Sequence, residues 1–157
     1  MVRPGTPEDA EAVARVNVET WQAAYAHALP RDLLMNLSVQ ERAEFWRSWP
    51  PLVAEVDGEI VGYVAVGAGS DGDADGELFA IYVHPDHWGT GAGRRLIQAG
   101  EERLRALGHS EASLWVLEDN PRARRFYEAA GWSTDGTTRP IELLGVEVPE
   151  ILYRKSL

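Results

Sequence analysis

The sequence contains no cysteine in its 157 residues. This excludes disulfide bonds, a thiolate nucleophile, an enzyme-bound thioester and cysteine-ligated zinc. The sequence also lacks an apolar run near the roughly 20 residues that a membrane-spanning helix needs. The first five residues, Met1 to Gly5, show no signal-peptide pattern. We therefore expect a cytoplasmic protein that has no membrane partner.

Basic residues are a minority, with 15 Lys and Arg against 25 Asp and Glu and a formal net charge of −10. A protein that binds nucleic acid needs a basic surface to neutralise phosphates, so we expect no nucleic-acid partner. The charge is compatible with an amine or cationic partner, and it also serves simply to keep the protein soluble. The four histidines follow no metal-ligand spacing. We therefore expect no metal site, with His84 and His87 as loop residues.

The length and the absence of internal repeats or linkers predict one domain over residues 1–157, because a chain of this size buries about two thirds of its surface. The stretch from Gly67 to Gly76 is rich in glycine and aspartate and predicts a surface loop between strands. We interpret its Asp71, Asp73 and Asp75 as solvated side chains, with attraction of a cationic substrate as the alternative.

Local patterns predict a mixed α/β domain around one sheet. Asp57-Gly58 between two β-rich runs predicts a tight hairpin. The expected helices run from Thr6-Pro7 to Leu29-Pro30, over 33–46, over 91–107 and from Asn120-Pro121 to Gly131. The expected strands lie at 52–56, 59–66, 78–83, 112–117, near Trp132 and at 150–154.

Three alternating glycines separate the strand that ends at Val83 from an amphipathic helix. A helix start exposes unpaired N–H groups at the positive end of the helix dipole, and glycines let an oxyanion approach that backbone. The pattern predicts a phosphate or pyrophosphate site, with a turn needed only for tight packing as the alternative. It lacks Gly-Lys-Ser/Thr and the G-x-G-x-x-G spacing, so neither a P-loop nor a dinucleotide fingerprint is present.

A second motif follows the strand that ends at Leu117. It runs Asn-Pro-Arg-Ala-Arg-Arg-Phe-Tyr-Glu-Ala-Ala-Gly-Trp from Asn120 to Trp132. Taken alone, Asn120 is an ordinary helix cap and Tyr127 an ordinary buried aromatic residue.

Together the two motifs resemble the GNAT superfamily of acyl-CoA-dependent N-acetyltransferases, and the resemblance covers most of the chain. It begins at Val2 and includes the Asp57-Gly58 hairpin and Val61-Gly62. The family's Gln/Arg-x-x-Gly-x-Gly/Ala motif corresponds to Trp88–Gly93, but Trp88 replaces Gln or Arg, so that side chain's contact is not carried over. The family's later pattern, Asn-x-x-Ala-x-x-Phe-Tyr-Glu-x-x-Gly-Phe/Trp, resembles residues Asn120 to Trp132 without a gap. The implied fold is a central, mostly antiparallel twisted sheet flanked by helices.

The resemblance also implies the residues that bind acetyl-CoA, which would be the cosubstrate. The pantetheine arm would pair with the backbone of Ile81, Tyr82 and Val83, and Asn120 would touch the cofactor. Arg122 is the candidate for the 3′-phosphate, although Arg124 and Arg125 also lie near it. The pyrophosphate would be held by Gly89, Thr90, Gly91, Ala92, Gly93 and Arg94.

Tyr127 is implied as the acid that protonates the departing CoA thiolate. This role fits independently, because an ordinary tyrosine titrates near 10 and an alkyl thiol near 8.5, so a neutral phenol can supply a proton or a hydrogen bond. An unprotonated amine would attack the acetyl carbonyl directly, while backbone N–H groups at 81–83 stabilise the oxyanion.

The general base has three candidates. Glu77 lies where some family members carry a basic glutamate at the start of the strand. Other members carry the base five residues before the asparagine, but that position here is Trp115. Glu118 is a nearby substitute, and a water chain is a third possibility. As an alternative, both glutamates are solvated residues at strand ends.

The acceptor pocket is expected at the first two helices and the strand ends. Trp21, Tyr25, Trp46 and Trp49 are candidates to line it for an apolar or aromatic amine, with the hydrophobic core as the alternative for at least half of them. The sequence thus predicts an N-acetyltransferase that acts on a primary amine of a small molecule or peptide, as a monomer or homodimer. A catalytically idle acyl-CoA sensor and a purely structural protein are the alternatives.

Overall fold

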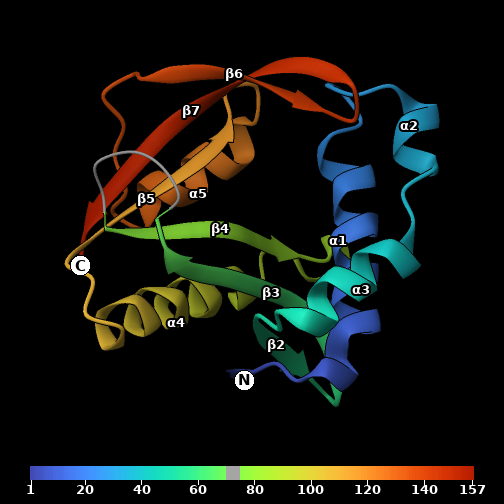
Figure 1. Ribbon diagram of the computed structural model, residues 1–157, viewed down its shortest axis with the longest axis horizontal. Helices are drawn as coiled ribbons and strands as arrows, with labels where there is room; N and C mark the ends of the chain where they lie inside the picture. The colour runs from blue at the N-terminus through green and yellow to red at the C-terminus, as the bar shows by residue number, and fades with distance from the viewer. Residues whose placement is uncertain (70–74) are drawn as a thin grey trace. The chain divides into compact units, whose positions relative to one another are not determined.

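The strands of the computed structural model, which describes residues 1–69 and 75–157, form one hydrogen-bonded series in the order β1-β2-β3-β4-β5-β7-β6. Contacts divide the chain into two compact units. The first unit contains residues 1–65 and 80–100, and the second contains 66–79 and 101–157. Strand β4 (Gly76–Val83) contributes residues to both units (Figure 1).

The first unit contains an antiparallel series of strands. β1 (Val2–Pro4) pairs with β2 (Leu52–Val56), and β2 pairs with β3 (Glu59–Ala68), of which residues up to 65 belong to this unit. Asp57 and Gly58 join β2 to β3 with φ angles of 51° and 78°. Positive φ at both turn residues matches the twist of the flanking strands, so the predicted hairpin is confirmed.

The helices of the first unit differ from the prediction at two places. A 3-10 turn (Pro7–Asp9) leads into α1 (Ala10–Ala24), which ends before the predicted Leu29. The single helix predicted over 33–46 is wrong, because α2 (Arg31–Met35) and α3 (Val39–Ser48) are separate. Ser38 causes the break, since its hydroxyl accepts a hydrogen bond from Glu41 N and caps a new helix.

The core of the first unit lies where α1 and α3 pack against each other and on the sheet (Figure 1). Trp46 is only 5% exposed, and its indole N–H donates to Asn17 Oδ1 over 3.4 Å. This bond satisfies two polar groups that would otherwise be buried without partners. The buried members of the core are Ala10, Val13, Ala14, Val16, Ala43, Trp46, Val53, Tyr63 and Ala65.

The second unit combines parallel and antiparallel pairing. The first residues of β4 run parallel to β5 (Glu111–Leu117), with Gly76 opposite Ala112. β5 pairs antiparallel with β7 (Val146–Ser156), which pairs antiparallel with β6 (Thr138–Leu143). Among the registers that are described, only β4–β5 is parallel, so the expected mostly antiparallel sheet is confirmed.

The strand predicted near Trp132 is wrong. That segment forms only an isolated bridge between Ser133 and Arg154, whereas the strand begins at Thr138. Trp132 is buried at 2% exposure, and its indole N–H is satisfied by donating to Glu101 Oε2 at 3.3 Å. The aromatic residue therefore serves the core of the unit, and its high strand propensity does not place it in a strand.

Two further helices carry the motif residues. α4 (Ala92–Ala106) begins in the first unit and ends in the second. α5 (Pro121–Ala129) belongs to the second unit, where Arg124 Nε donates to the hydroxyl of Tyr153 on β7. No helix among the described residues is long and apolar enough to cross a membrane.

Candidate functional site

The glycine-rich turn before α4 has an open backbone. Gly89 and Gly91 have φ angles of +78° and +89°, which side chains of L-residues rarely adopt. A Cβ atom at Gly89 would meet nothing within 4 Å, and one at Gly91 would meet only Arg95 Nη2 at 3.9 Å. The protein therefore leaves space beside this turn, as a bound anion requires.

The amides of this turn point to an anion site for a second reason. The first hydrogen bond of α4 runs from Arg95 N to Gly91 O over 3.1 Å. Because the N–H groups of Ala92, Gly93 and Arg94 precede it, they have no acceptor within the helix. Thr90 is held by a 2.7 Å bond from its hydroxyl to His87 O. We call residues 89–94 the amide cradle.

The end of β4 lies directly before the amide cradle in the first unit. Ile81, Tyr82 and Val83 are partly exposed, and His84 N donates to Val61 O at 2.8 Å. A Cβ atom at Gly62 would lie 2.8 Å from Tyr82 O, so only glycine allows the two strands to approach this closely.

Side chains also connect this strand end to its surroundings. The indole of Trp88 donates to Val83 O over 2.7 Å, and the hydroxyl of Thr20 lies 3.5 Å from the same oxygen. His84 Nε2 lies 3.0 Å from Glu19 on α1, while its Nδ1 accepts from Asp86 N. His84 is thus a loop residue with structural contacts, as predicted.

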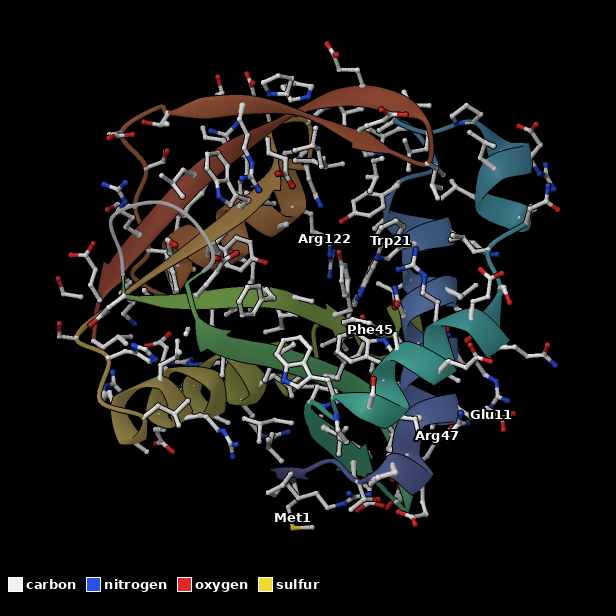
Figure 2. The ribbon with its side chains drawn as sticks, viewed as in Figure 1. Met1, Glu11, Trp21, Phe45, Arg47 and Arg122 are labelled. Atoms are coloured by element: carbon white, nitrogen blue, oxygen red, sulfur yellow. The ribbon has the colours of Figure 1, made fainter. Side chains whose placement is uncertain are left out.

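The start of α5 presents three of the predicted residues in the second unit. Asn120 Oδ1 accepts from Ala123 N at 3.2 Å, so the carbonyl side caps the helix and the amide N–H₂ group stays a donor. Arg122 is exposed in the first turn (Figure 2). Tyr127 is 7% exposed, and its ring lies 5.5 Å from Phe126 and 6.2 Å from Tyr153.

A hydrogen-bond network fixes α5 beside β7. The Tyr153 hydroxyl donates to Glu128 Oε2 at 2.7 Å and accepts from Arg124 Nε at 3.1 Å, and Arg124 Nη1 also donates to Glu118 O. Burial raises the pKa of Tyr153, so its phenol stays protonated as the donor. The hydrogen bond to Tyr153 raises the pKa of Arg124. The network therefore orients the helix that carries Tyr127.

The two glutamate candidates for the base have different surroundings. Glu77 is buried at 7% exposure on β4, with Ser113 of β5 opposite it in the parallel register. Glu118 is exposed just beyond β5. Of these two glutamates, Glu77 is therefore the one whose side chain is shielded from solvent.

The aspartate-rich loop is only partly described. Asp71 and Asp73 lie outside the described residues. The carboxylate of Asp75 accepts hydrogen bonds from Ser110 N and Glu111 N, which lower its pKa. Asp75 therefore caps the start of β5 and is not simply a solvated side chain. No cluster of three or more metal-ligating side chains occurs within 1–69 and 75–157.

The predicted aromatic residues form one cluster in the first unit. Tyr25 and Trp46 are buried, Trp21 is partly buried, and Trp49 is 40% exposed. The Trp21 ring lies 5.2 Å from Tyr25 and 6.4 Å from Tyr82, and the Tyr25 and Tyr82 hydroxyls share a 2.9 Å hydrogen bond. The guanidinium of Arg42 lies over Trp21, which sequence spacing did not predict because the two residues meet only in the fold.

Comparisons with known proteins identify the family. The model of the acetyltransferase (GNAT) family matches residues 11–132. The uncharacterized N-acetyltransferase YuaI of Bacillus subtilis is 32% identical over 157 residues, covering 96% of this chain and 89% of YuaI. The chain therefore belongs to the acetyltransferase (GNAT) family, as the two motifs indicated.

Solved structures share the fold. The PaiA N-acetyltransferase of Thermoplasma acidophilum, solved in complex with coenzyme A, has a TM-score of 0.78 at 20% identity, covering 100% of this chain and 98% of that one. The putative acetyltransferase yncA of Salmonella typhimurium, solved with acetyl-CoA, has a TM-score of 0.74 at 19% identity, covering 99% and 92%. At these identities the likeness establishes the fold alone.

Proposed function

We propose that residues 1–157 form one N-acetyltransferase domain that transfers an acetyl group from acetyl-CoA directly to a primary amine. The observation that carries this proposal is the amide cradle. Gly89 and Gly91 adopt positive φ, space remains beside these two residues, and the first amides of α4 lack helical acceptors. Family membership supports the reaction class, and an anion site at the cradle would serve that reaction.

The residues predicted to bind the cofactor would contact different parts of the cosubstrate. The amides of the cradle would hold the pyrophosphate, and the backbone of Ile81–Val83 would pair with the pantetheine arm. Asn120 would donate to the cofactor through the amide group that its capping bond leaves available. Arg122, exposed in the first turn of α5, would bind the 3′-phosphate.

Two residues would move protons. Tyr127 would donate a proton to the departing thiolate, a role that suits a buried phenol whose ring packs near those of Phe126 and Tyr153. Glu77 would accept the proton that the ammonium form of the acceptor must lose. If Glu77 is not the base, Glu118 or a chain of water molecules would accept this proton instead.

Acetyl-CoA-dependent thiol release over a panel of amines tests the proposal. The absence of cysteine helps, because the protein adds no thiol background. We expect release with one class of amine. Tyr127→Phe should lower kcat about 10²-fold or more without weakening CoA binding. Release at the wild-type rate would remove Tyr127 as the acid.

A second pair of variants separates binding from chemistry. Glu77→Gln should lower kcat at neutral pH, whereas Glu118→Gln should not if Glu77 is the base. CoA binding is followed by calorimetry in parallel. CoA binding with no turnover on any amine would favour the idle sensor, and no CoA binding would leave only a structural role.

A further inference from the structure

A group of hydrogen-bond donors in the first unit lacks a matching acceptor. Arg42 on α3 places its guanidinium carbon 5.0 Å from the centre of the Trp21 ring. No hydrogen bond or ion pair of this guanidinium is found with residues 1–69 or 75–157. In contrast, Arg3 pairs with Asp9 and Glu55, and the side chain of Arg139 pairs with Glu150. In a chain of net charge −10, a partly buried cation without a carboxylate needs a reason.

The second donor lies on the same ring. The indole Nε1 of Trp21 is buried and has no hydrogen-bond partner in the described part of the chain. A buried N–H group without an acceptor lowers the stability of the fold, so native proteins rarely keep one. The Tyr25 and Tyr82 hydroxyls beside it share a 2.9 Å hydrogen bond with each other, and neither accepts from the Trp21 indole. Figure 2 shows Trp21 projecting from α1 on the side of β3 and β4.

Aromatic rings lie beside these donors. Tyr25 and Tyr82 pack against Trp21, and Tyr63 lies 5.8 Å from Tyr82. Burial raises the pKa of Tyr63 well above its usual value of about 10, so its phenol stays neutral. Arg42 thus supplies one full positive charge beside low-polarity rings, where a charged hydrogen bond is stronger than in water.

We propose that Arg42 and the Trp21 indole bind a carboxylate of the acceptor amine, so that the substrate is an amino acid or a similar amine that carries a carboxylate. A carboxylate has two oxygens and accepts only, which suits two donors with no acceptor of their own. A single positive charge matches a monoanion better than a phosphate dianion. The aromatic rings would contact the apolar part of the substrate.

This inference rests on the proposed acetyltransferase activity and places the substrate beside the expected cosubstrate strand. Tyr82 belongs both to the aromatic cluster and to the β4 segment proposed to pair with the pantetheine arm. A carboxylate at Arg42 would therefore orient the amine from within the same unit. Arg42 and Trp21 are specificity determinants in this scheme and take no part in proton transfer.

The test uses three acceptors that differ in one group: phenylalanine, phenylalaninamide and phenethylamine. We expect kcat/KM of the wild type to be about tenfold or more higher for phenylalanine than for the other two. Arg42→Met should remove this preference by lowering the phenylalanine value alone, and Arg42→Lys should restore part of it. Trp21→Phe, which keeps an aromatic ring but loses the N–H group, should lower kcat/KM for phenylalanine about threefold to tenfold.

Arg47→Met is the matched control. Arg47 is an exposed arginine on the same helix and is labelled in Figure 2. Its loss should leave the preference unchanged. Equal or better turnover of phenethylamine by the wild type would overturn the carboxylate proposal while the acetyltransferase activity stands.

A binding measurement decides the inference even where no acceptor is acetylated. The probe is 3-phenylpropionate, compared with 3-phenylpropanol, titrated into the CoA-saturated protein and followed by calorimetry. We expect the carboxylate to bind about tenfold or more tightly than the alcohol in the wild type and equally in Arg42→Met. Equal binding of the two probes by the wild type would overturn the inference. Loss of CoA binding itself would instead contradict the proposed function.

Discussion

The indole N–H of Trp88 donates a 2.7 Å hydrogen bond to the carbonyl oxygen of Val83. Trp88 precedes the amide cradle and Val83 ends β4, so the bond fixes the cradle to the strand. Trp88 occupies the position at which the family's motif has Gln or Arg. We therefore expect Trp88 to position the site, because it joins the two segments proposed to bind pyrophosphate and pantetheine.

Removing this bond should weaken CoA binding. In Trp88→Phe the ring remains but the donor is lost, and a net hydrogen bond of about 0.5–1.5 kcal/mol predicts a Kd for CoA about threefold to tenfold higher. Calorimetry at a temperature well below unfolding measures it. Trp49→Phe is the control, because Trp49 is 40% exposed on the surface of the same unit. Unchanged affinity in Trp88→Phe would exclude the positioning role.

Gly62 should be essential for the approach of β3 to β4. A Cβ atom there would lie 2.8 Å from Tyr82 O and 2.9 Å from Leu96 Cδ1. Gly62→Ala should therefore lower the free energy of unfolding by about 1–3 kcal/mol, as measured by urea denaturation. Because a backbone carbonyl is one obstacle, shortening the side chain with Leu96→Val should not rescue Gly62→Ala. Rescue would show that the leucine alone causes the clash.

The correctly predicted parts of the fold are those whose conformation is set by residues adjacent in the sequence. Asp57-Gly58 forms its hairpin through its own φ preferences, and the glycines before α4 likewise set a local turn. The separation of α2 from α3 was missed because helical spacing continues across it, while the cap at Ser38 ends that continuity. Strand β6 was missed because its pattern depends on pairing with β7.

In the candidate site, too, local sequence patterns differ from contacts that arise through packing. The motif residues at Gly89–Arg94 and Asn120–Tyr127 follow contiguous patterns, which is why the sequence alone singles them out as candidates. Arg42 over Trp21 joins α3 to α1, and Tyr153 joins β7 to α5. No sequence spacing encodes these contacts, because they arise only when the helices pack.

The carboxylate of Asp9 should make the free energy of unfolding depend on pH. Its hydrogen bonds with Arg3, at 2.8 and 3.1 Å, lower its pKa from 3.8 to about 2. A lowered pKa stabilises the folded state above pH 3.8, and this contribution is lost as the pH falls toward 2. The side chains of Arg3 and Asp9 are 30% and 15% exposed, so we expect a contribution of about 1 kcal/mol, less than the shift alone would give.

Urea unfolding of the wild type and Asp9→Asn at several pH values measures this contribution. The difference in unfolding free energy should be about 1 kcal/mol at pH 6 and should shrink toward zero near pH 2. Asp32→Asn removes an exposed carboxylate on α2 and serves as the control. A difference that is independent of pH would mean that the pair contributes nothing through ionisation.

The pairing of Lys155 with Glu101 should support the helix that carries Tyr127. Lys155 Nζ donates to Glu101 Oε1 at 2.7 Å and to Ala130 O at 2.8 Å, just beyond the end of α5. Glu101 is 4% exposed, so within residues 1–69 and 75–157 Lys155→Met leaves this buried carboxylate with only Trp132 at 3.3 Å and Arg105 at 3.6 Å. Breaking a buried pair costs about 3–5 kcal/mol, and the remaining Arg105 places the expected loss near the lower end.

The double variant Lys155→Met with Glu101→Leu separates charge from packing. It should recover most of the lost stability, because replacing both members of a buried pair with apolar residues is often neutral. Arg105→Met alone should have little effect, since Arg105 is half-exposed at 48%. If the double variant regains stability while kcat falls, the bond from Lys155 to Ala130 O is what positions α5. If kcat also recovers, the pair serves stability alone.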